Sequence, residues 1–223
     1  MQKRFPKRAV GYMMEGDVYA AQKKWPEAER AYRETLKHEN TAVVAMRLHA
    51  SMVEGGKKNE ANAFETSWLK QSPQDAAFNM YLADLSLRGK DYAGAARHYK
   101  AVLIEQPNNA IALNNLAYVA GETGDPNAIK YAEQALALAP DSPAVQDTLG
   151  WLLVQKGDAK RGTEILRKAA ELAPNSAEIR LHLAKALIKT GDRNSARSEL
   201  EAIVKLPQQA ATREEAEKLL ATL

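Results

Sequence analysis

The chain has 223 residues, of which 45% are hydrophobic and 26% charged, a composition typical of a chain that folds around an apolar core. Lysine and arginine (31) nearly balance aspartate and glutamate (28), so the charge does not favour a nucleic-acid partner. The sequence has no cysteine, which excludes disulfides, thiolate metal sites and a cysteine nucleophile. No apolar run reaches the roughly 18 residues of a membrane-spanning helix, so we expect no membrane insertion by this segment.

Three kinds of residue recur along the sequence at intervals of 33 or 34 positions. Small residues stand at Ala28, Ala61, Ala95, Ala128, Gly162 and Ala196. Leucines stand at Leu48, Leu82, Leu116, Leu149 and Leu183, and prolines at Pro73, Pro107, Pro140, Pro174 and Pro207. Three markers that share one period indicate a repeat architecture.

Each repeat predicts two helices joined by a turn. The turn contains glycine and aspartate, as in Gly89-Lys-Asp91, Gly157-Asp158 and Gly191-Asp192. Glycine suits the left-handed residue that ends a helix, and aspartate can cap the next helix. The second helix pairs a small residue with a large one four positions later, such as Ala95 with Tyr99, and a proline then ends the repeat. We therefore expect an all-α fold.

A helix–turn–helix of this length with these markers resembles the tetratricopeptide repeat (TPR). The resemblance implies a right-handed superhelix of about six repeats, an α-solenoid. The predicted units span residues 9–41, 42–75, 76–109, 110–142, 143–176 and 177–207. Residues 1–8 are predicted to form a basic tail, and residues 208–223 a helix that caps the last unit.

Two of the predicted units depart from the pattern. The first has Glu15-Gly16 where leucine and a small residue are usual. The second is irregular in its second helix, where Phe64 and Glu65 stand around the expected aromatic position.

The last third of the chain resembles a narrower group. Residues 147–155, 178–189 and 214–220 are similar to the large TPR lipoproteins associated with exosortase/PEP-CTERM sorting and exopolysaccharide loci in Gram-negative bacteria. Those proteins carry a signal and a lipobox cysteine that this sequence lacks. The resemblance therefore implies a C-terminal fragment of a periplasm-facing outer-membrane lipoprotein, whereas a native start at Met1 would imply the cytoplasm.

Catalytic and metal-binding patterns are missing from the sequence. Histidines occur at His38, His49, His98 and His182, without metal-ligand spacing on one helix face. Phosphate-binding and serine-nucleophile motifs do not occur either. We expect no enzyme, no metal site and no cofactor.

The period does predict a binding surface. In the fifth unit Asp147 and Trp151 fall roughly 110–150° from the buried stripe of Leu149, Gly150 and Leu153. First helices line the concave face of TPR arrays, so the resemblance predicts a peptide-binding groove. The predicted groove residues are Asn114, Asn115, Tyr118, Asp147, Thr148 and Trp151, with Lys185, Lys189 and Arg88 adding positive charge at the ends. Amides and hydroxyls would bind a peptide backbone, and the two aromatic rings would act as anchors.

Several alternatives stay open. Tyr118 and Trp151 could fill space between adjacent units instead of binding a peptide. The chain could be a scaffold for an unidentified protein partner, or a structural component that self-associates through the first unit near Tyr12, Met13 and Met14. A third alternative is a cytoplasmic accessory subunit.

Overall fold

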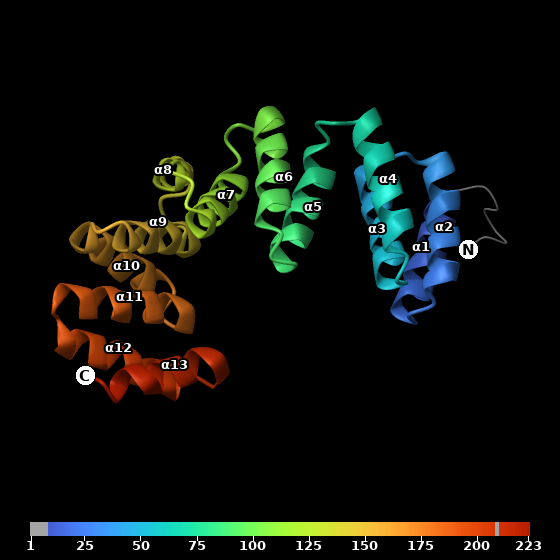
Figure 1. The fold of residues 1–223 in the computed structure, drawn as a ribbon. Helices are drawn as coiled ribbons and strands as arrows, with labels where there is room; N and C mark the ends of the chain where they lie inside the picture. The colour runs from blue at the N-terminus through green and yellow to red at the C-terminus, as the bar shows by residue number, and fades with distance from the viewer. Residues whose placement is uncertain (1–8, 208–209) are drawn as a thin grey trace. The chain divides into compact units, whose positions relative to one another are not determined.

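The computed structural model describes residues 9–207 and 210–223, and every regular element in these ranges is an α-helix (Figure 1). The predicted tail, residues 1–8, and residues 208–209 lie outside the described residues. Helix contacts divide the chain into two compact units that meet between Pro107 and Asn108. The all-α repeat fold predicted from the sequence is confirmed.

The N-terminal unit contains six helices among its described residues: α1 (Ala9–Ala21), α2 (Trp25–His38), α3 (Ala42–Glu54), α4 (Lys58–Gln71), α5 (Ala76–Arg88) and α6 (Tyr92–Glu105). The C-terminal unit contains α7 (Ala110–Thr123), α8 (Ala128–Leu138), α9 (Pro143–Gln155), α10 (Ala159–Leu172), α11 (Ala177–Thr190), α12 (Arg193–Lys205) and α13 (Ala210–Leu220). Within each unit, consecutive helices pack in pairs.

The recurring residues of the sequence form the core of both units. The five periodic leucines of the first helices are at most 2% exposed: Leu48, Leu82, Leu116, Leu149 and Leu183. The six periodic small residues of the second helices are buried as well. Because a helix packs closely only where its contact side chains are small, these positions bring the two helices of each repeat together.

Aspartate caps second helices as predicted. The capping side chains are Asp91, Asp158 and Asp192, each accepting a hydrogen bond from the backbone N–H three residues later. Gly157 (φ 102°) and Gly191 (φ 87°) take the left-handed conformation just before their caps. The same prediction for Gly89 is wrong, because Gly89 has a helical φ of −79° and Lys90 is left-handed (φ 59°). The left-handed residue directly precedes the cap, and Gly89 stands one position too early.

Helices α9 and α10 approach each other through two facing glycines. A Cβ added to Gly162 would lie 2.6 Å from the Gly150 carbonyl oxygen and 2.6 Å from Cγ2 of Val154. A Cβ added to Gly150 would lie 3.0 Å from the Gly162 carbonyl oxygen. Neither contact leaves room for a methyl group, so the backbone separation of this repeat depends on both glycines.

Gly162→Ala should therefore destabilise the protein, by about 1–3 kcal/mol in urea unfolding, because the backbone must shift to admit the methyl group. Gly89→Ala is the matched control, since its added Cβ would lie 3.5 Å from its nearest neighbours at a negative φ. The control should stay within about 0.5 kcal/mol of the wild type. Equal effects of the two substitutions would contradict the close approach at Gly162.

Helix α13 covers the apolar side of the last helical pair. Its residue Ala216 is fully buried, in one cluster with Leu181 of α11 and with Leu200 and Ile203 of α12. Leu219, Leu220 and Leu223 are partly buried against the same cluster. In repeat arrays each repeat contacts only its neighbours, so a terminal helix protects mainly the repeat beside it.

Ala216→Asp should place a carboxylate in this cluster and loosen α11 and α12 more than α7–α9, because an unpaired buried charge is costly. Hydrogen exchange of the backbone amides measures the difference between these helices. Ala221→Asp, on an exposed residue of the same segment, is the control and should leave exchange unchanged. Uniform loosening from α7 to α12 would contradict local capping.

Candidate functional site

A cavity of about 440 Å³ opens among the first helices of three successive repeats in the C-terminal unit, α7, α9 and α11. We call it the α7–α9–α11 groove. It brings together six predicted residues: Asn114, Asn115, Tyr118, Asp147, Thr148 and Trp151. The charged or ionisable side chains in its lining are Asp147, Glu122, Glu178 and His182.

The helical period explains why α9 can serve both the core and the groove. Leu149, Gly150 and Leu153 are buried, whereas Asp147 and Trp151 stand on another side of the helix and are only partly buried. Tyr118, on α7, is 43% exposed and ranks among the exposed large apolar side chains. The groove therefore presents aromatic surface to solvent.

Trp151 also packs between repeats. Its indole stacks on the imidazole of His182 from α11, with ring centroids 4.6 Å apart and planes within 9° of parallel. The same indole packs against the buried cluster that contains Val154 and Leu183. Trp151 thus lines the groove and also joins α9 to α11.

Asp147 holds the imidazole of His182 in place. The Nδ1 atom of His182 lies 2.9 Å and 3.0 Å from the two carboxylate oxygens of Asp147. The ammonium of Lys185, one turn further along α11, lies 5.6 Å from the centre of the Trp151 ring. Two repeats therefore share one layer of charged and aromatic groups at the groove.

The polar side chains differ in how much hydrogen-bonding capacity they retain. The Thr148 hydroxyl donates to the Ala144 carbonyl of its own helix. Asn114 donates from Nδ2 to Oδ1 of Asn115 over 3.4 Å, a long hydrogen bond. Among the described residues, nothing donates to the buried Oδ1 atom of Asn114. Asn114 thus retains an unused acceptor at the groove.

The three basic residues predicted at the ends of the groove do not line it. Lys185 forms an ion pair of 2.8 Å with Glu215 of α13, and the Lys189 ammonium donates to the Val154 carbonyl at 2.6 Å. Arg88 ends α5 and belongs to the other unit. Since none of the three cations lines the groove, its acidic and basic groups are three carboxylates and one imidazole.

Sequence reasoning missed His182, Glu122 and Glu178. The spacing of His182 does not fit a metal ligand, and no other motif marks it. The repeat period contained a usable signal, since His182 stands 34 residues after Thr148 and so occupies the same register on the next first helix. Neither a metal cluster of three or more His, Asp or Glu side chains nor a helix long and apolar enough to cross a membrane occurs in residues 9–207 and 210–223.

Paired helices with a periodic core, and a groove along successive first helices, define this chain as a helical-repeat protein of the α-solenoid class. Family models described as "Tetratricopeptide repeat" match residues 61–110, 91–143 and 153–223. The chain belongs to the tetratricopeptide repeat family, whose fold is typically a non-catalytic scaffold for protein partners.

Known relatives and solved structures agree with this family. Cellulose synthase 1 operon protein C of Komagataeibacter xylinus is 27% identical over 91% of this chain, which covers 16% of that protein. The matched part of this chain spans between 9% and 37% of the length of the curated relatives that it resembles. A tetratricopeptide repeat protein from Parabacteroides merdae superposes with a TM-score of 0.76 at 15% identity, over 96% of this chain and 86% of its own. YrrB, described as a TPR protein with an unusual peptide-binding site, superposes with a TM-score of 0.64 at 15% identity, over 84% and 98% of the two chains.

Trp151→Ala should lower the free energy of unfolding by about 1–3 kcal/mol, less than for a fully buried tryptophan, because its ring is only partly buried. Tyr118→Ala should change it by less than about 0.5 kcal/mol, since that ring is exposed. Urea unfolding followed by circular dichroism measures both values. An unaffected Trp151→Ala variant would contradict the packing role of the indole.

Proposed function

We propose that this chain is a non-catalytic interaction scaffold whose α7–α9–α11 groove binds an extended peptide segment of a partner protein. The observation that carries the proposal is the cavity itself, which joins amides and aromatic rings from successive repeats. Asn114 and Asn115 supply hydrogen-bonding groups for a peptide backbone. Tyr118 supplies an exposed flat ring, the kind of side chain that dominates binding energy at interfaces.

The charge of the groove lining favours binding of a basic peptide. Glu122, Asp147 and Glu178 contribute carboxylates, whereas His182 is the only basic type among the lining residues. Complementary charge raises association rates and suppresses partners of the wrong sign. A segment that carries lysine or arginine next to an apolar residue therefore fits the groove better than an acidic segment.

We further propose that the chain works within a larger bacterial assembly. That assembly makes or exports polysaccharide, or it sorts exported proteins. Two observations support it. One is the similarity to cellulose synthase 1 operon protein C over most of the chain. The other is the resemblance of residues 147–155, 178–189 and 214–220 to PEP-CTERM-associated lipoproteins. A periplasm-facing location goes with this system, and a cytoplasmic accessory subunit is the alternative.

The peptide proposal is tested by fluorescence anisotropy with labelled twelve-residue peptides that share apolar anchors and differ in charge. Tyr118→Ala should weaken binding of the tightest-binding basic peptide by about 2 kcal/mol, roughly a thirtyfold increase in Kd, as loss of a hot-spot aromatic does. Ile111→Ala removes an exposed apolar side chain from the same helix outside the groove lining and should leave affinity unchanged. Equal binding of acidic and basic peptides, or an unaffected Tyr118→Ala variant, would contradict the proposal.

A second candidate function is self-association through α1. Val10, Met14 and Val18 follow each other at intervals of four residues and are each 45–55% exposed, so they form one apolar stripe. Tyr12, by contrast, stacks on His38 of α2 and belongs to its own repeat. Met14→Glu should shift a sedimentation profile from dimer to monomer if this stripe pairs two copies, and a wild type that is monomeric at high concentration would contradict self-association.

A further inference from the structure

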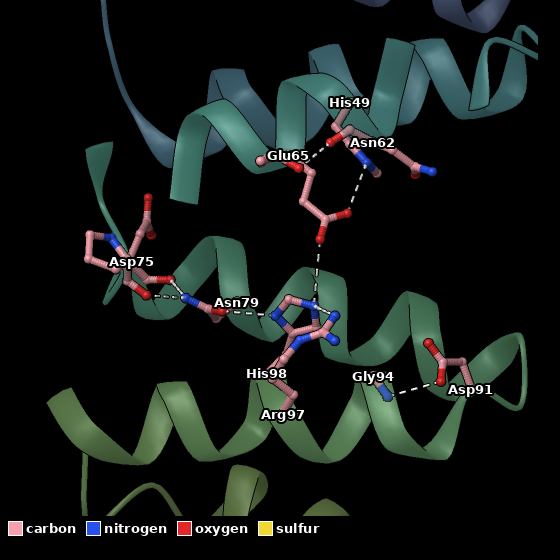
Figure 2. A network of polar contacts seen from close by, with 11 residues as sticks. His49, Asn62, Glu65, Asp75, Asn79, Asp91, Gly94, Arg97 and His98 are labelled. Carbon is pink, nitrogen blue, oxygen red and sulfur yellow. Dashed lines mark hydrogen bonds and ion pairs between the residues drawn. The ribbon is translucent and has the colours of Figure 1, made fainter. Parts of the chain in front are cut away.

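A second cavity, of about 560 Å³, lies in the N-terminal unit among helices α3, α4, α5 and α6. Its lining includes His49 from α3, Glu65 from α4 and His98 from α6, and Figure 2 shows the Glu65 carboxylate between the two imidazoles. Both imidazoles are nearly inaccessible to solvent, at 2% and 3% exposure, whereas the Glu65 side chain is 25% exposed. The volume falls within the range of small-molecule sites in proteins, about 300–1,000 Å³.

The neighbouring repeats show which contact this cavity replaces. In the first and third repeats, a tyrosine four residues after the periodic alanine donates its hydroxyl to an aspartate of the first helix. At the corresponding positions the second repeat carries Glu65 and Ala50. It therefore places a carboxylate in this layer without the hydroxyl that pairs with one in the neighbouring repeats. The two pairs are Tyr32 with Asp17 at 2.8 Å and Tyr99 with Asp84 at 2.7 Å.

His49 explains why no tyrosine stands in the second repeat. It occupies the register position of Gly16, and a Cβ added to Gly16 would lie 2.5 Å from the Tyr32 ring. An imidazole at this position and a phenol ring at the position of Glu65 would therefore overlap. The two differences belong together, since an imidazole and a carboxylate take the places of a glycine and a phenol.

His98 uses both of its ring nitrogens within the chain. The Nδ2 group of Asn79 donates to the Asp75 carbonyl at 3.0 Å, so Oδ1 of Asn79 accepts from Nδ1 of His98, also at 3.0 Å. The guanidinium of Arg97 donates to Nε2 at 3.2 Å. Burial, with a smaller contribution from Arg97, lowers the pKa of His98 to about 4, so the ring is uncharged at neutral pH. His98 therefore forms a wall of the cavity rather than a contact for a ligand.

His49 and Glu65, by contrast, have unused hydrogen-bonding capacity among residues 9–207 and 210–223. Nδ1 of His49 lies 2.9 Å from the Tyr81 hydroxyl, but its buried Nε2 has no partner. The Glu65 oxygens lie 4.0 Å from this Nε2 and 3.8 Å from Nε2 of His98, and both distances exceed a hydrogen bond. The Tyr81 hydroxyl can donate or accept, so Nε2 of His49 presents an N–H in one tautomer and a lone pair in the other. A buried polar group without a partner is costly, and a ligand that bonds to it removes this cost.

We propose that this cavity binds a neutral, hydroxyl-rich small molecule, a sugar or a polyol, through Glu65 and His49. One ligand hydroxyl donates to the Glu65 carboxylate, as a tyrosine hydroxyl donates to an aspartate in the neighbouring repeats. A second hydroxyl lies against Nε2 of His49 and donates or accepts according to the tautomer. The 4.0 Å between the two protein groups allows hydroxyls on adjacent carbon atoms to reach both. The site is separate from the α7–α9–α11 groove, which belongs to the other unit.

The charges of the lining favour a neutral ligand. Lys58 and Arg97 are basic and Glu65 and Asp91 are acidic, whereas burial lowers the pKa of both imidazoles. The Glu65 carboxylate would repel an anionic ligand, and the Arg97 guanidinium would repel a cationic one. An apolar ligand would leave Glu65 and His49 without partners. Hydroxyl groups satisfy both residues without adding charge.

The remaining lining suits the ring of a sugar. Val53, Leu82 and Leu85 contribute apolar surface that the C–H groups of a ring can contact, and Asn62 and Ser86 add an amide and a hydroxyl. Small-molecule sites generally combine apolar walls with a small number of placed polar groups. The cavity thus offers contacts for the ring as well as for its hydroxyls.

Titration of the full chain with neutral ligands, followed by nuclear magnetic resonance at pH 7, tests the site. The ligands are glucose, galactose and mannose and their reduced polyols, which separate a preference for the ring from a preference for an open chain. At least one of them should shift the amide signals of residues 61–66 and the imidazole signals of His49, with a Kd of about 1 mM. The uronic acid of the tightest-binding sugar should bind at least about tenfold more weakly, because its carboxylate faces Glu65.

Substitutions test which residues bind the ligand. Glu65→Gln keeps the size of the side chain but removes its charge, and should raise Kd about tenfold, because charge-assisted hydrogen bonds are the stronger ones. His49→Ala installs the small residue of other repeats, removes Nε2 and should raise Kd by a similar factor. Glu60→Gln is the matched control, since it removes a carboxylate from an exposed residue of the same helix outside the lining. This control should bind as the wild type does. If a variant does not fold, Glu65→Leu installs the core residue of the fifth and sixth repeats and should abolish binding.

Two results would overturn the proposal. One is the absence of saturable shifts with every neutral ligand up to about 50 mM, which would mean that the cavity holds only water. The other is wild-type affinity in both Glu65→Gln and His49→Ala, which would place the ligand elsewhere. Tyr118→Ala, in the groove of the other unit, should leave sugar binding unchanged. Failure of this site is therefore distinguishable from failure of the peptide proposal.

Discussion

The structure depends on one recurring contact, in which a small residue of each second helix lies against the first helix of the same repeat. Between α9 and α10 the contact is made by Gly150 and Gly162, where each glycine occupies the space that a side chain on the other would need. Alanine performs the same role in most other repeats, and a large residue four positions later fills the remaining space. Because the contact repeats at a constant interval, it sets the orientation of every helix within a unit. All other surfaces of the protein follow from that orientation.

The α7–α9–α11 groove is one such consequence. A helix that buries Leu149 and Leu153 must turn Asp147 and Trp151 to another side. Because the sequence pattern recurs in each repeat, the neighbouring first helices turn their corresponding residues to the same side. The groove is not separate from the core, since the Trp151–His182 stack both lines it and joins α9 to α11. If the groove binds a peptide as proposed, binding and the packing of neighbouring repeats are coupled through the same two rings. This coupling makes exposed residues such as Tyr118 the better probes of binding.

The N-terminal unit shows what happens when the recurring contact carries the wrong side chain. Glu65 keeps the register of a core residue but brings a charge, and the space that a ring would fill remains open. Phe64 and Trp68, next to Glu65 along α4 but on a neighbouring face of the helix, pack against Phe78 of α5. The same stretch of α4 thus presents aromatic rings to α5 on one face and a carboxylate to the cavity on another.

Much of the fold and part of the groove could be predicted from the sequence. The period, the aspartate caps and the core positions are local properties, because a 33–34-residue interval specifies which side of each helix meets the next. The same geometry predicted six residues that line one cavity, from Asn114 to Trp151. At the Gly89 turn the predicted left-handed residue was wrong by one position, because Lys90 is left-handed instead of Gly89. The position of the following cap decides which residue is left-handed.

The partners of individual side chains were decided only by the tertiary structure. The sequence places Lys185 and Lys189 on the first helix of the last repeat. It does not predict that Lys185 pairs with the Glu215 carboxylate or that Lys189 donates to the Val154 carbonyl. It records four separate histidines, whereas folding stacks one on Trp151 and sets two others around Glu65. Long polar side chains reach several ångströms in more than one direction, so their contacts depend on which helices meet. The repeat pattern determines where a backbone runs, and the packed neighbours determine which charge faces which.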